Sequence, residues 1–265
     1  MSDLHATHLG EHGPRVVFCH GLFGQGRNWT TAAKALAGRH RVTLLDMPNH
    51  GRSAWTEHLD YVDMADTVAA TVRGGGEDPV ALVGHSMGGK IAMLLALRHP
   101  DLVERLCVVD MSPVTYDAGR SEFAGYIAAM SGMDLDALER RADADAALSP
   151  AVPHPTIRGF LLQNLRSGGT DGGWRWAPNL ALLGAELEVL SGWPEDRLAD
   201  TTPYDGPVLW VAGATSPYVT DDYEPAMSRW FPRQRRVTVK NAGHWVHSEQ
   251  PEVFAEVLRR FVDGA

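Results

Sequence analysis

The motif G-H-S-M-G over residues 84–88 is the strongest chemical signal in the sequence. It directly follows the apolar run Val80–Val83 and precedes a helical pattern over Met87–Arg98, the strand–turn–helix setting that a G-x-S-x-G motif requires. Glycines suit so tight a turn because a Cβ atom would collide there, and the turn lifts the serine hydroxyl above the sheet edge. We therefore predict that Ser86 is a nucleophile for acyl transfer.

A nucleophilic serine needs a general base. Among 12 histidines, His244 has the most suitable position, because it follows the apolar run Arg236–Val239 and precedes a final helical pattern. This agrees with the chain order Ser…acid…His of one large class of serine enzymes. His247, three residues further on, is the nearest alternative.

The acid of the triad is harder to place. Its usual position, just past the run Val208–Ala212, holds Ser216, which cannot carry a charge. Asp110 ends the preceding apolar run, and neighbouring strand ends lie only about 4.8 Å apart, so it can reach the same histidine. We predict Asp110 as the acid and Ser216 as an accessory hydrogen-bonding partner. Asp221 and Asp222 are the alternatives, although their position also suits the cap of a helix.

Acyl transfer also needs donors for the oxyanion. One donor is expected to be the backbone N–H of Met87, the residue after the nucleophile. The second should come from the loop after the run Val16–His20, where Leu22 is preferred and Phe23 is the second choice. The glycines of this loop fit neither a phosphate-binding loop nor a dinucleotide fingerprint, so we expect no nucleotide cofactor.

The elements that must position these residues alternate along the chain. Short apolar runs that read as buried parallel strands are Val16–His20, Arg41–Met47, Val80–Gly84, Leu106–Met111, Val208–Ala212 and Arg236–Val239. Helical patterns between them are Trp29–Ala37, Met64–Arg73, Met87–Arg98, Tyr223–Trp230 and Glu252–Val262. This alternation predicts an α/β fold with a mostly parallel central sheet flanked by helices, and Leu4–Leu9 can add a strand.

One segment interrupts the alternation. Residues 113–203 show only helical patterns, at Arg120–Ser131, Leu135–Ala147, Thr156–Asn164 and Leu180–Leu190. A stretch of this length must have structure of its own. We predict a helical cap, or lid, inserted into a core domain formed by residues 1–112 and 204–265. Aromatic residues that could build a substrate pocket, or simply pack the cap onto the sheet, are Phe123, Tyr126, Trp174, Trp176, Trp193 and Trp245.

Composition excludes other classes of protein. The chain has 265 residues, a formal charge of −9, 44% hydrophobic residues and two cysteines. This excludes a disordered chain and a disulfide-rich secreted module, and an acidic balance does not suit nucleic acid. No apolar stretch reaches the roughly 20 residues of a membrane span, and the first residues do not resemble a signal peptide. We expect a cytoplasmic monomer or homodimer, and the scattered histidines and cysteines predict no metal site.

Several motifs together resemble a known family. The sequence resembles the α/β-hydrolase superfamily and, more narrowly, the YbfF-type bacterial esterases and their eukaryotic relatives, the abhydrolase domain-containing protein eleven group. The matching segments are HGLFG at 20–24, DMPNHGRS at 46–53, GHSMGGK at 84–90, VDMSPV at 109–114, WRWAPNL at 174–180 and NAGHW at 241–245. In that group the acid is thought to follow the sixth strand and a serine occupies the usual acid position, as Asp110 and Ser216 do here. The region Arg140–Pro153 departs from the pattern.

The resemblance implies a serine hydrolase that needs no cofactor and cleaves carboxylic esters or acyl thioesters. An acyltransferase to alcohols, a C–C hydrolase and a perhydrolase would use the same residues. A non-catalytic ligand-binding member of the fold is less compatible with the pairing of Ser86 and His244, because a receptor needs neither residue.

Overall fold

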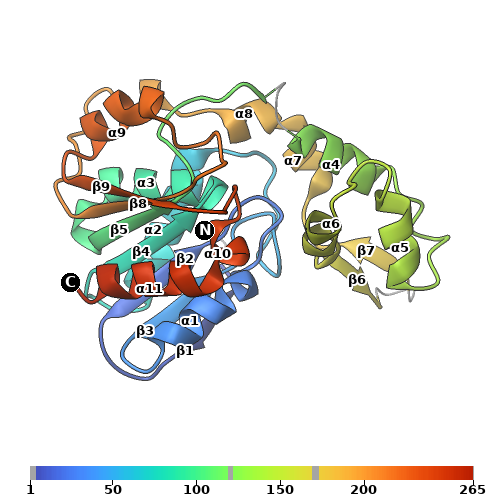
Figure 1. Ribbon diagram of the computed structural model, residues 1–265, viewed down its shortest axis with the longest axis horizontal. Helices are drawn as coiled ribbons and strands as arrows, with labels where there is room; N and C mark the ends of the chain where they lie inside the picture. Colours follow the sequence, from blue (N-terminus) through green and yellow to red (C-terminus); the bar gives the residue numbers. More distant parts are fainter. Residues whose placement is uncertain (1–3, 119–121, 169–172, 265) are drawn as a thin grey trace.

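The computed structural model describes residues 4–118, 122–168 and 173–264, and its centre is a seven-stranded sheet (Figure 1). The strand order is β1-β3-β2-β4-β5-β8-β9. Strand β1 runs antiparallel to β3, and the other neighbouring pairs are parallel. The strands are β1 (Ala6–Leu9), β2 (Arg15–Cys19), β3 (Arg41–Leu45), β4 (Val80–His85), β5 (Val103–Val109), β8 (Val208–Gly213) and β9 (Gln234–Val239).

Helices cover both faces of this sheet. In β2, Val17 and Cys19 belong to one apolar core, whereas Val16 and Phe18 belong to the other. Successive residues of a strand point to opposite faces, so a strand buried on both faces is apolar throughout. Helices α2 (Tyr61–Gly74), α3 (Met87–Arg98) and α9 (Glu224–Trp230) contribute to the first core, and α1 (Thr30–Leu36), α10 (Val246–Glu249) and α11 (Pro251–Val262) to the second.

The predicted α/β fold is confirmed, and the additional strand predicted within Leu4–Leu9 is the antiparallel edge strand β1. A protein of this architecture places ligands beyond the carboxyl ends of its parallel strands. Strands β4, β5 and β8 end at that edge with residues 85, 109 and 213. Ser86 and Asp110 directly follow β4 and β5, and the loop that contains Ser216 follows β8. Within the described ranges, no helix is both long and apolar enough to cross a membrane.

The chain between β5 and β8 forms a separate group of elements, here called the insertion, which stands to one side of the core (Figure 1). Its elements are α4 (Phe123–Ser131), α5 (Arg141–Leu148), α6 (Pro155–Leu162), β6 (Leu165–Ser167), β7 (Trp174–Trp176), α7 (Leu180–Ala185) and α8 (Leu187–Ser191). Strands β6 and β7 pair as an antiparallel hairpin.

The insertion differs from the sequence prediction in three places. A strand pair occurs where only helices were expected, because three residues per strand are too few to produce a visible alternation. The expected helix over residues 180–190 is two helices, since Glu186 leaves helical geometry at φ −109° and ψ 28°. The helix expected from residue 135 begins at Arg141. Residues 120 and 121 of another expected helix lie outside the described residues.

Candidate active site

The turn between β4 and α3 places Ser86 at the carboxyl edge of the sheet. Ser86 has a φ of +53°, a strained conformation for a residue with a side chain. A Cβ atom on Gly84 would collide with the carbonyl oxygen of Gly88, and one on Gly88 would collide with the carbonyl oxygen of Cys19. The two motif glycines therefore allow the start of α3 to pack against the sheet, which fixes the position of the serine.

The carboxylate of Asp110 lies at the end of the neighbouring strand β5 and is fully buried. Its Oδ1 accepts a hydrogen bond from Gly213 N–H at 2.9 Å, and its Oδ2 accepts bonds from the hydroxyl of Ser216 and, at 2.8 Å, from Nδ1 of His244. Ser216 thus contacts the carboxylate and not the imidazole. A buried charge is tolerated only when it is paired and hydrogen-bonded in this way.

The contact with Asp110 fixes the orientation of the His244 ring. An ionised carboxylate only accepts hydrogen bonds, so Nδ1 carries the proton and Nε2 is free to take one. Nε2 is buried and forms no hydrogen bond to any described residue, Ser86 included. Contacts of this kind are often loose without substrate and tighten when it binds. The ring packs against those of Tyr218 at 4.3 Å and His85 at 4.7 Å between centroids.

The alternatives for base and acid occupy other environments. His247 packs its ring against Trp29 at 4.3 Å, outside the cavity that contains Ser86. Burial lowers the pKa of His247 to about 3. Asp221 forms an ion pair with Arg236 at 2.6 Å, and Asp222 is exposed.

The two candidates for the second oxyanion donor, Leu22 and Phe23, have different surroundings. Leu22 lines the cavity beside Ser86, as does Met87, the residue expected to supply the first donor. The N–H of Phe23 already donates to Nε2 of His50 at 3.2 Å. His50 can accept it because its Nδ1 contacts the carbonyl of Pro48 at 2.9 Å and burial lowers its pKa to about 4. The second-choice prediction of Phe23 is therefore corrected, since its amide is engaged elsewhere.

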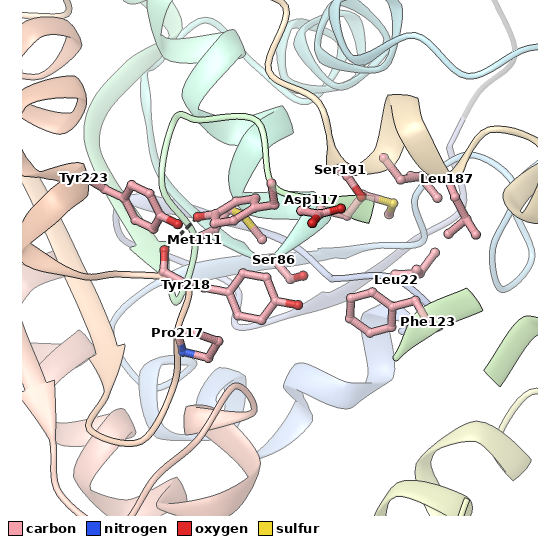
Figure 2. Close-up of a pocket in the computed structure, with 13 residues that line it drawn as sticks. Leu22, Ser86, Met111, Asp117, Phe123, Leu187, Ser191, Pro217, Tyr218 and Tyr223 are labelled. Atoms are coloured by element: carbon pink, nitrogen blue, oxygen red, sulfur yellow. Dashed lines mark hydrogen bonds between the residues drawn. The ribbon is translucent and has the colours of Figure 1, made fainter. Parts of the chain in front are cut away.

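A cavity of about 250 Å³ opens above Ser86. Figure 2 shows Ser86 between Tyr218 on one side and Leu22 and Phe123 on the other. The cavity draws its wall from the core and from the insertion, and its lining residues are Leu22, Ser86, Met87, Met111, Tyr116, Asp117, Phe123, Leu187, Leu190, Ser191, Pro217, Tyr218 and Tyr223.

Of the aromatic residues predicted for a pocket, only Phe123 lines this cavity. Trp174 and Trp176 donate their indole N–H groups to carbonyls inside the insertion, those of residues 138 and 130, both at 2.9 Å. Tyr126 donates to Glu122 at 2.9 Å, while Trp245 lines a different cavity. The pocket prediction is corrected for these four residues because they pack the insertion itself or its junction with the core. Trp193, also considered, is buried but does not line this cavity.

Residues that sequence reasoning missed complete the wall. Tyr218 lies two positions after Ser216, so its nearness to His244 could have been anticipated. Leu187 and Leu190 come from α8, whose separation from α7 was not predicted. Within the described ranges, no group of three His, Cys, Asp or Glu side chains is arranged to hold a metal ion.

A buried lysine supports the same wall. Lys90 has no exposed surface, and its Nζ donates to the carbonyls of Ser191 at 2.7 Å and Gly192 at 2.5 Å. The ammonium lies 5.6 Å from the ring centroid of Tyr61 and 5.0 Å from that of Tyr116, both favourable distances for a cation over an aromatic ring. Burial lowers the pKa of Lys90 to about 7. Helix α3, which begins directly after Ser86, is thereby tied to the end of α8.

Comparison with known proteins identifies the family of this chain. The alpha/beta hydrolase fold family model matches residues 14–251. The mouse sn-1-specific diacylglycerol lipase ABHD11 is 41% identical over 255 residues, covering 94% of this chain and 81% of that protein. Esterase YbfF of Escherichia coli K12 is 30% identical over 248 residues, covering 94% and 92%. A solved marine microorganism esterase superposes with a TM-score of 0.93 at 31% identity, covering 98% of this chain and all of that one. The chain belongs to the α/β-hydrolase fold family.

Proposed function

We propose that Ser86, His244 and Asp110 form the catalytic triad of an ester-cleaving serine hydrolase. The protein is an enzyme of the ester-cleaving type, in keeping with relatives named lipase and esterase. The observation that carries the residue assignment is the 2.8 Å contact between Asp110 and Nδ1 of His244, which leaves the buried Nε2 free beside the nucleophile turn.

In the proposed reaction, Nε2 of His244 removes the proton of Ser86 as its oxygen attacks the ester carbonyl. The N–H groups of Leu22 and Met87 stabilise the oxyanion, and Asp110 stabilises the imidazolium. His244 then protonates the leaving alcohol. Water hydrolyses the acyl-enzyme by the same route in reverse, so the chain's own groups complete the cycle without a cofactor.

The size of the cavity supports small substrates. Its volume of about 250 Å³ is slightly below the roughly 300–1,000 Å³ typical of ligand sites. Residues 113–203 act as a lid that supplies Phe123 and Leu187 to this cavity. Esters with short acyl groups are therefore the proposed substrates, with short-chain thioesters as a chemically equivalent class. A cytoplasmic location and a monomer or homodimer stay predictions from the sequence.

The test is hydrolysis of p-nitrophenyl esters from acetate to palmitate by the wild type and by Ser86→Ala. We expect the wild type to favour acetate to hexanoate and the folded variant to lose at least about a thousandfold in kcat/KM. Equal activity of the two proteins would show that Ser86 is not the nucleophile. Formation of ethyl esters when ethanol is added would instead indicate an acyltransferase.

A further inference from the structure

One buried side chain of the insertion contacts the loop that carries the proposed oxyanion donor. This oxyanion loop, residues 21–24, closes with a hydrogen bond from Gly24 N–H to the carbonyl of Gly21 at 2.9 Å. Asn164, between α6 and β6, has no exposed surface. Its Nδ2 donates to the carbonyl of Phe23 at 2.7 Å, and its Oδ1 accepts from Nε2 of Gln25 at 3.0 Å.

The oxyanion loop needs such support because its conformation is strained. Phe23 has a φ of +59° at the third position of the turn, where type II turns usually require glycine. A left-handed residue with a side chain is strained and persists only when its surroundings fix it. Its N–H is held by His50 of the core, and its carbonyl by Asn164 of the insertion. Both polar backbone groups of Phe23 are thus restrained, from two parts of the molecule.

Asn164 is itself firmly held. Its N–H donates to the carbonyl of Leu161 at 3.0 Å, and its carbonyl accepts from Ala177 N–H at 2.9 Å. Its partner Gln25 is 4% exposed and also accepts a bond from Arg166 at 2.6 Å. Because all these groups are placed by hydrogen bonds, the side-chain amide of Asn164 has one orientation available.

We infer that Asn164 is a positioning residue that keeps the oxyanion loop in its reactive conformation. The insertion then contributes to the chemical step as well as to the shape of the substrate cavity. When the bond to its carbonyl is lost, Phe23 relaxes towards negative φ, which rotates the adjoining peptide groups and displaces Leu22 N–H. This inference rests on the proposed function, because it assigns Leu22 as an oxyanion donor.

The experiment compares Asn164→Leu and Asn164→Asp with the neighbouring control Gln163→Leu. Gln163 lies in the same junction, where its Oε1 accepts from Asn28 at 2.6 Å, and its side chain forms no hydrogen bond with Phe23. At pH 8 we would measure kcat and KM for p-nitrophenyl butyrate, inhibition by an alkyl boronic acid, which forms a tetrahedral adduct on serine, and thermal unfolding of each protein.

We expect both Asn164 variants to lower kcat by about 10–100-fold, with KM within about threefold, since an oxyanion donor acts mainly in the transition state. The boronic acid should bind more weakly by a similar factor, whereas Gln163→Leu should stay within about twofold of wild type. If Asn164→Leu does not fold, Asn164→Asp gives the answer, because it keeps the shape and the bond from Gln25, and its kcat relative to wild type should fall as the pH is raised from 6 to 9 and the carboxyl loses the proton that it could donate to Phe23.

Folded Asn164 variants with wild-type kcat would overturn the inference. Changes equal to those of Gln163→Leu would also overturn it, because they would reflect general weakening of the junction. Failure of the proposed function is a separate result, since it would appear as retained activity in Ser86→Ala.

Discussion

Nδ1 of His244 and Oδ2 of Asp110 lie 2.8 Å apart, although 134 positions separate the two residues in the chain. The sheet brings them together because β5, which ends just before Asp110, is the neighbour of β8, and β8 is the neighbour of β9. Ser216 follows β8 and donates its hydroxyl to the same carboxylate. The proposed acid thus comes from one strand earlier than the usual position, and the serine at the usual position donates a hydrogen bond to it.

Asp110→Asn should reduce kcat/KM by about a thousandfold or more, because the amide cannot stabilise the imidazolium and favours the wrong tautomer of His244. Steady-state kinetics with a short-chain p-nitrophenyl ester measure the loss. Asp222→Asn is the matched control, since Asp222 is exposed, and it should retain full activity. The opposite pattern in these two variants would reject the assignment of the acid.

Ser216→Ala should have a smaller effect. The Asp110 carboxylate keeps its bonds from Gly213 and His244 but loses one charge-assisted hydrogen bond in a buried site. We expect kcat to fall about tenfold with little change in KM. Ser216→Thr, which retains the hydroxyl, should recover most of the lost rate. A Ser216→Ala enzyme as inactive as Asp110→Asn would mean that the serine does more than support the carboxylate.

Substrate length should respond to the cavity wall. Phe123→Ala removes a ring from the lining and should move the preferred acyl chain to a greater length, whereas Leu187→Trp should restrict the enzyme to acetate or propionate. The ratio of kcat/KM between a long and a short p-nitrophenyl ester reports this directly, because effects on the triad cancel. Tyr126→Phe provides the control, since Tyr126 does not line the cavity. An unchanged ratio in both cavity variants would place the acyl chain elsewhere.

The lowered pKa of the buried Lys90 predicts that the stability of the protein depends on pH. In the unfolded chain it has the ordinary pKa of 10.5, whereas burial lowers the pKa to about 7 in the folded protein. Between these values the unfolded state binds a proton that the folded state does not. Raising the pH through this window therefore favours folding, and the destabilisation by Lys90 is complete below pH 7.

The free energy of unfolding in urea, measured at pH 6, 7.5 and 9 for the wild type and Lys90→Met, isolates this contribution. Methionine has a similar shape and does not titrate. Above pH 7, the free energy of unfolding of the wild type should rise relative to that of the variant by about 1.4 kcal/mol per pH unit. A difference that is constant from pH 6 to 9 would contradict the lowered pKa.

Sequence reasoning identified the three residues of the proposed triad because each follows the end of an apolar run. Parallel strands bring such ends to one edge of the sheet, so their position in the chain is almost their position in space. Met87 and Leu22 could also be proposed, because each lies in a turn that follows a strand and contains glycines.

The aromatic residues of the insertion could not be placed in this way. Trp174 and Trp176 have suitable side chains for a pocket, but the direction in which each points depends on how short helices pack against one another. Their indole N–H groups are satisfied by carbonyls within the insertion, which no pattern in the sequence reports. The hydrogen bond that engages Phe23 N–H depends on His50, 27 residues away, and is invisible for the same reason. Lys90 gave a signal that was not used, namely the one charged residue among the otherwise uncharged residues 87–97 of a helical segment.

Ser86 and Lys90 are four residues apart, about one turn of α3, so one helix carries the proposed nucleophile at its beginning and binds the end of α8 a turn later. This has a consequence for chimeric enzymes. We expect a foreign insertion grafted between β5 and β8 to be accepted only if it returns to the core with two carbonyl groups facing that ammonium. A graft without these carbonyls would leave the Lys90 ammonium buried without a hydrogen-bond acceptor from the insertion. Replacing Lys90 with methionine should allow such hybrids to fold.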